Sequence, residues 1–205
     1  MIIKSNDRIH YLASPASGLN LHMDQNPFKK IGRHCVQGMI PFLDVTEDIG
    51  GLKLVPKSHS DEIQEQIRKE RSIMQRILSS GDFVKVDDAK YDPEAIVVEA
   101  KAGDLILWDS RVIHGSQAGP GMLEGGGSAG GLARCSGLVC MTPRTKASQE
   151  VLGQRELGFQ AGAGFSHWPH EAASTGLGNT DGRNISWSSG QHKPVELSPL
   201  QKAVL

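Results

Sequence analysis

Short apolar segments, separated by glycine and polar turn residues, follow one another through the first 145 residues. Several of these segments alternate apolar and polar positions, which is typical of half-buried strands. The predicted strands are 34–45, 51–56, 95–100, 104–110, 111–116 and 133–141. Strands this short, joined by turns, favour an all-β sandwich or barrel over a βαβ sheet. Pro41 cannot donate a ladder hydrogen bond, so the first strand is predicted to be an edge, bulged or short strand.

Two segments have helical spacing instead. In 61–78, apolar residues recur every three or four positions and charged residues occupy the other face, which predicts a helix inserted between strands. Asp61 followed three residues later by Gln64 resembles a capping box and places the helix start there. A second helix is predicted at 146–157, followed by a loosely ordered C-terminal tail.

Composition narrows the function classes. The chain has 205 residues, a hydrophobic fraction of 38% and a net charge of −1, which fits one globular domain and lacks the basic surface of a nucleic-acid or anionic-membrane binder. Three cysteines without a C-x-x-C pair argue against a disulfide framework or a thiolate zinc site. No apolar run approaches the roughly 20 residues of a membrane span. We therefore expect a cytoplasmic protein.

Two metal-ligand residues stand one position apart in "LHMD", at His22 and Asp24. In a strand, residues i and i+2 point to the same face, so an imidazole and a carboxylate would lie side by side while Leu21 and Met23 pack on the other face. These are two members of the 2-His-1-carboxylate set that suits non-haem Fe(II). Alone, such a pair also fits an ordinary strand.

The third member would be a histidine brought back by the fold. His114 ends an apolar strand after the polar turn 109–111, whereas the other histidines lie in polar or loop segments. Later, alternation in 133–141 places Arg134 on one face of a core strand. A guanidinium there is costly to bury unless it meets an anion, and its planar fork suits a carboxylate. Pairing with an acid of the protein, or exposure to solvent, stays open as the alternative.

Four segments together resemble the phytanoyl-CoA dioxygenase family of Fe(II)/2-oxoglutarate-dependent oxygenases. They are "HMDQNP", "VQGMIPFLDVTEDIGGLKLVPKSHS", "AGDLILWDSRVIHGS" and "RCSGLVCMTPR". The resemblance implies a mainly β, double-stranded β-helix (a jelly roll, cupin-like) with a few packed helices. It implies that His22, Asp24 and His114 form the catalytic centre and hold Fe(II). It also implies that Arg134 binds the distal carboxylate of 2-oxoglutarate, with Ser116 helping to bind this cosubstrate.

The expected activity is hydroxylation of a small organic substrate, with O2 and 2-oxoglutarate converted to succinate and CO2. A carboxylate at Asp24 favours hydroxylation, because halogenating relatives have a small residue there. A requirement for ascorbate and the oligomeric state stay open. We expect residues 1–145 to form the oxygenase domain, with the helical insertion at about 61–78, and 146–205 to complete the same domain.

Two features depart from the family pattern. Only 21 residues precede His22, which implies a domain shortened at its N-terminal side, and the Gly-rich loop 119–132 lengthens the spacing to Arg134. The first departure keeps a second interpretation open: a non-catalytic, shortened jelly roll of the same family that binds metal or a partner. A third interpretation is a cupin-like metalloprotein of another class, which would need no interior arginine.

Overall fold

The structure, a computed structural model, describes residues 2–12, 20–71, 81–120, 134–160, 164–171, 174–176, 196, 198 and 199. Its strands are β1 (Ile2–Leu12), β2 (His22–Met23), β3 (Val36–Pro41), β4 (Leu52–Leu54), β5 (Val84–Lys85), β6 (Ile96–Val97), β7 (Ile106–Asp109), β8 (His114–Ser116), β9 (Arg134–Pro143), β10 (Gly164–Phe165) and β11 (Ser174–Gly176). Its helices are α1 (Asp61–Glu70), α3 (Asp88–Tyr91) and α5 (Gln149–Gln160), with 3-10 turns η1 (Asp92–Glu94) and η2 (Arg144–Lys146).

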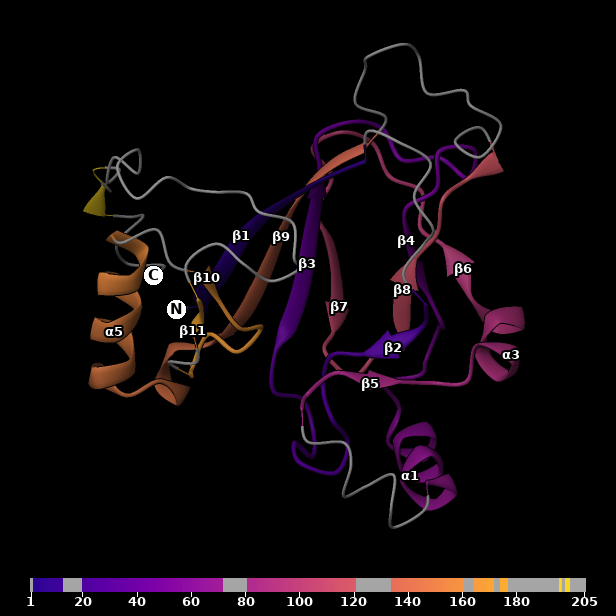
Figure 1. The fold of residues 1–205 in the computed structure, drawn as a ribbon, viewed down its shortest axis with the longest axis horizontal. Helices are drawn as coiled ribbons and strands as arrows, with labels where there is room; N and C mark the ends of the chain where they lie inside the picture. Colours follow the sequence, from indigo (N-terminus) through magenta and orange to yellow (C-terminus); the bar gives the residue numbers. More distant parts are fainter. Residues whose placement is uncertain are drawn as a thin grey trace. The chain divides into compact units, whose positions relative to one another are not determined.

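The strands form two larger sheets with the orders β1-β9-β3-β7 and β5-β2-β8-β4-β6, and β10 pairs with β11 separately. The chain passes from one larger sheet to the other between β2 and β3, between β3 and β4, and again along β7, β8 and β9 (Figure 1). Neighbouring strands such as β3 and β7, and β4 and β8, are antiparallel. This alternation between two antiparallel sheets is that of a jelly roll. The predicted mainly β, double-stranded β-helix is confirmed.

The five-stranded sheet packs a cluster of apolar side chains on the face that α1 and α3 cover. Leu21, Met23 and Ile113 pack there with Ile67 of α1 and Tyr91 of α3, and Met23 and Ile113 are fully buried. Burial of each large side chain contributes about 1.5–3 kcal/mol. Because side chains alternate along a strand, the residues between these apolar ones face the other way, toward the four-stranded sheet.

The six predicted strands lie where the pattern placed them, but most are shorter. β3 is an interior strand of its sheet and has six residues, so of the three alternatives predicted for the segment containing Pro41 the short strand is confirmed and the edge position is wrong. Pro41 is its last residue, where the missing N–H costs no interior ladder bond, and the next residue, Phe42, donates its N–H to Cys135 O at 2.8 Å. Gly50, before β4, has a positive φ of 79°, a backbone conformation that favours glycine.

The helix predicted at 61–78 begins as expected, but its cap is different. Ser60 is the N-cap and its side chain accepts from Ile63 N–H, whereas Asp61 lies in the first turn. Gln64 is no capping residue, because its side chain is buried and turned toward the sheet. The predicted continuation at 72–78 lies outside the described residues, as do residues 121–132 of the predicted Gly-rich loop.

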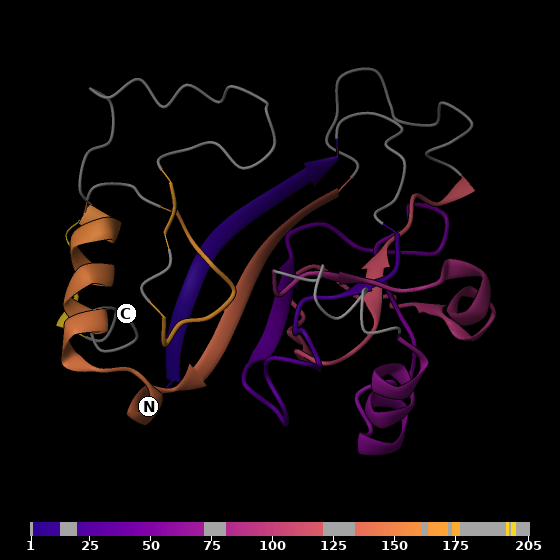
Figure 2. The same ribbon diagram turned by 60° about the horizontal axis from the view of Figure 1, so that its bottom comes forward.

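The chain divides into two compact units, residues 8–138 and residues 1–7 with 139–205. The boundary falls inside β1 and β9, which run side by side in Figure 2. β1 borders β9 in the four-stranded sheet, so the described N-terminal strand does not lie beside β2. The predicted division at residue 145 stays a prediction.

In the second unit, the helix predicted at 146–157 is present as α5, which begins at Gln149 and ends at Gln160. Arg155 of this helix is buried, and its guanidinium carbon lies 4.5 Å from the ring centre of Phe165. Phe165 and Trp168, both within the predicted tail, are buried as well. None of the described helices has the length and apolar character needed to cross a membrane.

Gln64 ties α1 to the segment that precedes β8. Its Nε2 donates to Ser58 O at 2.9 Å and to Arg111 O at 3.1 Å. Gln64→Leu removes the donor of both hydrogen bonds and leaves the two carbonyl oxygens without it in buried surroundings. The free energy of unfolding should fall by about 1–3 kcal/mol. Urea denaturation measures this loss, and Gln66→Leu on the exposed face of the same helix should cost less than about 0.5 kcal/mol. Equal losses for the two variants would contradict the assignment.

Candidate metal centre

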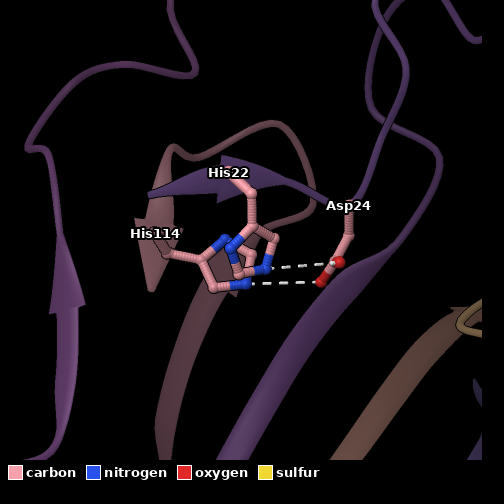
Figure 3. Close-up of side chains that lie close together, drawn as sticks. All are labelled: His22, Asp24 and His114. Carbon is pink, nitrogen blue, oxygen red and sulfur yellow. Dashed lines mark ion pairs between the residues drawn. The ribbon is translucent and has the colours of Figure 1, made fainter. Parts of the chain in front are cut away.

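His22, Asp24 and His114 converge on one point inside the jelly roll (Figure 3). β2 and β8 are antiparallel neighbours, and their register places His22 directly opposite His114. Asp24 follows β2 by one residue and turns its carboxylate toward both rings. Nε2 of His22 lies 3.6 Å from Asp24 Oδ1, and Nε2 of His114 lies 3.3 Å from Asp24 Oδ2. All three residues are buried.

Both imidazoles are oriented by the backbone two residues before them. Nδ1 of His22 lies 2.8 Å from Asn20 O, and Nδ1 of His114 lies 2.9 Å from Val112 O. A carbonyl oxygen only accepts, so each Nδ1 carries the hydrogen and donates it. The lone pair of each neutral ring is then on Nε2, the atom that faces Asp24. This arrangement fixes the tautomer that ligates a metal through Nε2.

The geometry suits a six-coordinate divalent ion. Ligand atoms bonded at roughly 2.1 Å to one ion and at right angles are about 3 Å apart. The three ligand atoms lie within 4.8 Å of one another, so a small contraction brings them to one centre. Two imidazole nitrogens and one carboxylate oxygen are also the donor set of non-haem Fe(II) sites. The residues present therefore fit ferrous iron.

Asp24 has a further partner from the other sheet, which sequence reasoning missed. Gln37 on β3 is buried, and its Nε2 donates to Asp24 Oδ2 at 2.6 Å. The sequence feature that could have indicated this partner is a polar residue inside the otherwise apolar strand "VQGMIP". Sequence alone does not show which residue of the other sheet this side chain meets.

Aromatic rings lie beside both histidines. Phe83 stacks on His22 with ring centres 4.6 Å apart, and Trp108 lies 5.6 Å from the ring of His114. Phe83 is 46% exposed, so one side of the centre is close to solvent. Neither ring was singled out from the sequence.

The segment after Asp24 is held by a second polar network. Gln25 is buried; its Oε1 accepts from Ser110 Oγ at 2.6 Å, and its Nε2 donates to Lys30 O at 2.6 Å. Ser110 lies in the turn before His114, so this bond joins the two ligand-bearing segments. The residue after the H-x-D pattern is therefore structural.

The carboxylate dominates the electrostatics of the centre. Burial by itself lowers the pKa of His114. The hydrogen bond to Asp24 and the charge of Asp24 raise the pKa by more than burial lowers it, so the pKa of His114 lies above its ordinary value. An imidazole next to an anion is stabilised in its charged form. A divalent cation bound between these side chains would likewise compensate the negative charge of Asp24.

The predicted cosubstrate residues lie on the expected strands. Arg134 is the first residue of β9; it is half-buried, and burial lowers its pKa. Within the described part of the chain, its guanidinium makes no hydrogen bond or ion pair, with the triad or otherwise. Ser116 lies on β8 two residues after His114, on the same face by alternation. Their roles stay predictions.

The described residues contain a single cluster of histidine, cysteine or acid side chains that could hold a metal, and it is this triad. His59 and His167 are exposed and lie outside this cluster. His192 lies outside the described residues.

Comparison with known proteins agrees with this geometry. The sequence profile of the phytanoyl-CoA dioxygenase (PhyH) family matches residues 10–120, more than half of the chain, and includes all three members of the triad. The chain belongs to the phytanoyl-CoA dioxygenase family. The resemblance inferred from the four sequence segments is confirmed.

This phytanoyl-CoA dioxygenase family member is similar to a curated protein and to several solved structures. "Ava biosynthesis cluster protein O" of Aspergillus versicolor is 30% identical over 158 residues, which are 73% of this chain and 48% of that protein. Among solved structures, EvdMO1 matches with a TM-score of 0.47 and 17% identity, over 70% of this chain and 28% of that one. The non-heme alpha ketoglutarate dependent carbocyclase SnoK from nogalamycin biosynthesis matches with a TM-score of 0.38 and 18% identity, over 69% and 47%. The chain spans about half the length of the curated relative.

Each ligand of the triad should be needed for metal binding. We expect the wild-type protein to bind one Co(II), a stand-in for Fe(II) that resists oxidation, and to be stabilised by about 2.7 kcal/mol at 100 times the dissociation constant. His22→Ala, Asp24→Ala and His114→Ala should each weaken binding by well over about 100-fold, more than loss of an outer-shell contact does. Titration calorimetry and thermal unfolding measure both effects.

His59→Ala is the matched control, because this exposed histidine lies in the same compact unit. It should bind Co(II) as the wild type does. Undiminished binding by any of the three triad variants would show that the ion lies elsewhere.

Proposed function

We propose that this chain is an Fe(II)- and 2-oxoglutarate-dependent dioxygenase that hydroxylates a small organic substrate. The single observation that carries the proposal is the convergence of His22, Asp24 and His114, with both Nε2 lone pairs and a carboxylate oxygen directed at one point. Membership of the family supports the reaction class. The substrate takes one atom of O2, and 2-oxoglutarate takes the other as it becomes succinate and CO2.

The protein residues would act by ligation and orientation. His22 and His114 would bind the ion through Nε2, and Asp24 would bind it through one carboxylate oxygen and neutralise part of its charge. Three protein ligands leave three positions of an octahedral ion for small molecules. When bound, Fe(II) supplies the activation of O2 that amino-acid side chains cannot. Asp24 in the ligand set favours hydroxylation over halogenation, as the family resemblance implies.

Arg134 would hold the far carboxylate of 2-oxoglutarate. Its half-buried guanidinium lies in surroundings that disfavour an isolated charge, as the lowered pKa indicates, and it has no partner among the described residues. An anion with planar geometry would satisfy it by two parallel hydrogen bonds. Ser116, on the same strand as His114, would donate a further hydrogen bond to this cosubstrate.

The second candidate function is a non-catalytic, metal-binding member of the family. The observation that favours it is the extent of the family match, because the matched region, residues 10–120, does not include Arg134, the residue proposed to bind the cosubstrate. Such a protein would retain the triad and bind metal without turning over 2-oxoglutarate.

Binding of 2-oxoglutarate tests the role of Arg134. In the absence of oxygen, Fe(II) with 2-oxoglutarate should quench tryptophan fluorescence, since Trp108 lies 5.6 Å from the ring of His114. Arg134→Ala should raise the dissociation constant of 2-oxoglutarate by about 10–100-fold, because a charge-assisted contact is worth about 1.5–3 kcal/mol. Affinity for Co(II) should not change.

Arg68→Ala serves as the control, because Arg68 lies on α1 in an exposed ion pair with Glu65. It should bind 2-oxoglutarate as tightly as the wild type does. Full affinity in Arg134→Ala would remove Arg134 from the cosubstrate site.

Release of succinate separates the two candidate functions. A dioxygenase should convert 2-oxoglutarate slowly to succinate with Fe(II), ascorbate and O2 even without its substrate, and His114→Ala should abolish this release. The measurement is succinate formed per protein chain, by chromatography. Tight binding of metal and 2-oxoglutarate with no succinate above the His114→Ala background would favour the non-catalytic member. Absence of both binding and turnover would overturn the dioxygenase proposal.

A further inference from the structure

Gln37 is a buried polar residue whose position in the core lowers the stability of the fold. It lies on an interior strand of the four-stranded sheet and is only 3% exposed. Its amide makes one hydrogen bond, from Nε2 to Asp24 Oδ2 at 2.6 Å. Its Oε1 is buried and, within the described part of the chain, accepts no hydrogen bond. A buried acceptor left unsatisfied costs about 1–3 kcal/mol, which an apolar side chain of similar size would avoid.

Asp24 fixes which way this amide faces. With the amide turned around, Oε1 would lie against a carboxylate oxygen at hydrogen-bond distance, and two acceptors repel. The observed orientation therefore serves the carboxylate rather than Gln37. Polar residues that cost stability in a core are expected where function requires them.

The hydrogen bond also distinguishes the two oxygens of Asp24. Oδ2 accepts from Gln37 at 2.6 Å and also lies 3.3 Å from Nε2 of His114, whereas Oδ1 lies 3.6 Å from Nε2 of His22. The hydrogen bond occupies a lone pair of Oδ2 and so lowers the capacity of this oxygen to bind a metal relative to Oδ1. Because Gln37 comes from the four-stranded sheet and Asp24 from the end of β2, this single contact also joins the two sheets at the centre.

We propose that Gln37 is a positioning residue that holds Asp24 in a single-oxygen binding mode and so sets the affinity of the metal centre and the number of coordination positions left open to small molecules. This inference rests on the metal site of the proposed function and adds a residue to it. Partners of this kind, one step away from the ion, typically change metal affinity by about 10–100-fold. Gln37 keeps one coordination position free that a carboxylate binding through both oxygens would occupy.

The test uses Gln37→Met, which keeps the length and volume of the side chain and removes the donor. We expect Co(II) to bind about 10–100-fold more weakly and its visible absorption bands to change, because Asp24 released at Oδ2 can bind through both oxygens and displace a small-molecule ligand from the ion. The midpoint of thermal unfolding of the metal-free variant should stay within a few degrees of wild type, since loss of the unpaired Oε1 offsets loss of the donor. Gln37→Asn, too short to reach Asp24, should behave as Gln37→Met does.

Gln66→Met, an exposed substitution of the same kind on α1, should leave Co(II) affinity and spectrum unchanged. If the wild type binds Co(II) and Gln37→Met binds it equally tightly with the same spectrum, the role of Gln37 is overturned and the metal site stands. If Gln37→Met unfolds at a much lower temperature and its bound-metal spectrum is that of wild type, Gln37 is structural only. If the wild type itself binds no Co(II), both the metal site and the role of Gln37 fail.

Discussion

The carboxylate of Asp24 lies buried between two imidazole rings, and such a charge needs compensation inside a protein. In this chain the amide of Gln37 donates to the carboxylate, and His22 and His114 compensate the charge when Nε2 of their rings is protonated; these side chains come from strands of both sheets. The two sheets must therefore meet at this point for the charge to be tolerated. A divalent cation bound there would compensate the charge more fully than hydrogen bonds do.

Alternation along two short strands makes this arrangement possible. Leu21, Met23 and Ile113 form the apolar core under α1 and α3, and the same alternation turns the ligand side chains to the opposite face. Stability and chemistry thus use alternate positions of the same strands. Hydrogen bonds from Ser110 to Gln25 and from Gln64 to Arg111 then fix the segments that enter and leave these strands, so that the side chains of the triad hold their directions.

Local sequence was sufficient to predict which side chains converge at the candidate centre but not what surrounds them. The H-x-D pattern and an imidazole at the end of a later apolar strand identified His22, Asp24 and His114, because alternation is a local property. Which residues would face them across the fold depends on the register between strands far apart in the chain. For this reason Gln37 and Trp108, paired on β3 and β7, were missed, although the strands themselves were predicted. The helix cap was misplaced by one residue, since Ser60 and Asp61 are both good capping residues and only geometry distinguishes them.

The central claim, that His22, Asp24 and His114 share one ferrous ion, is tested most directly by a crystal structure of the protein grown without oxygen in the presence of Fe(II). Diffraction data collected at the iron absorption edge locate the ion independently of the protein atoms. The account predicts one strong anomalous peak per chain, within bonding distance of both Nε2 atoms and of one oxygen of Asp24. An iron peak at bonding distance from other residues would contradict the account. So would the absence of a peak at the triad in crystals of protein that metal analysis shows to contain iron.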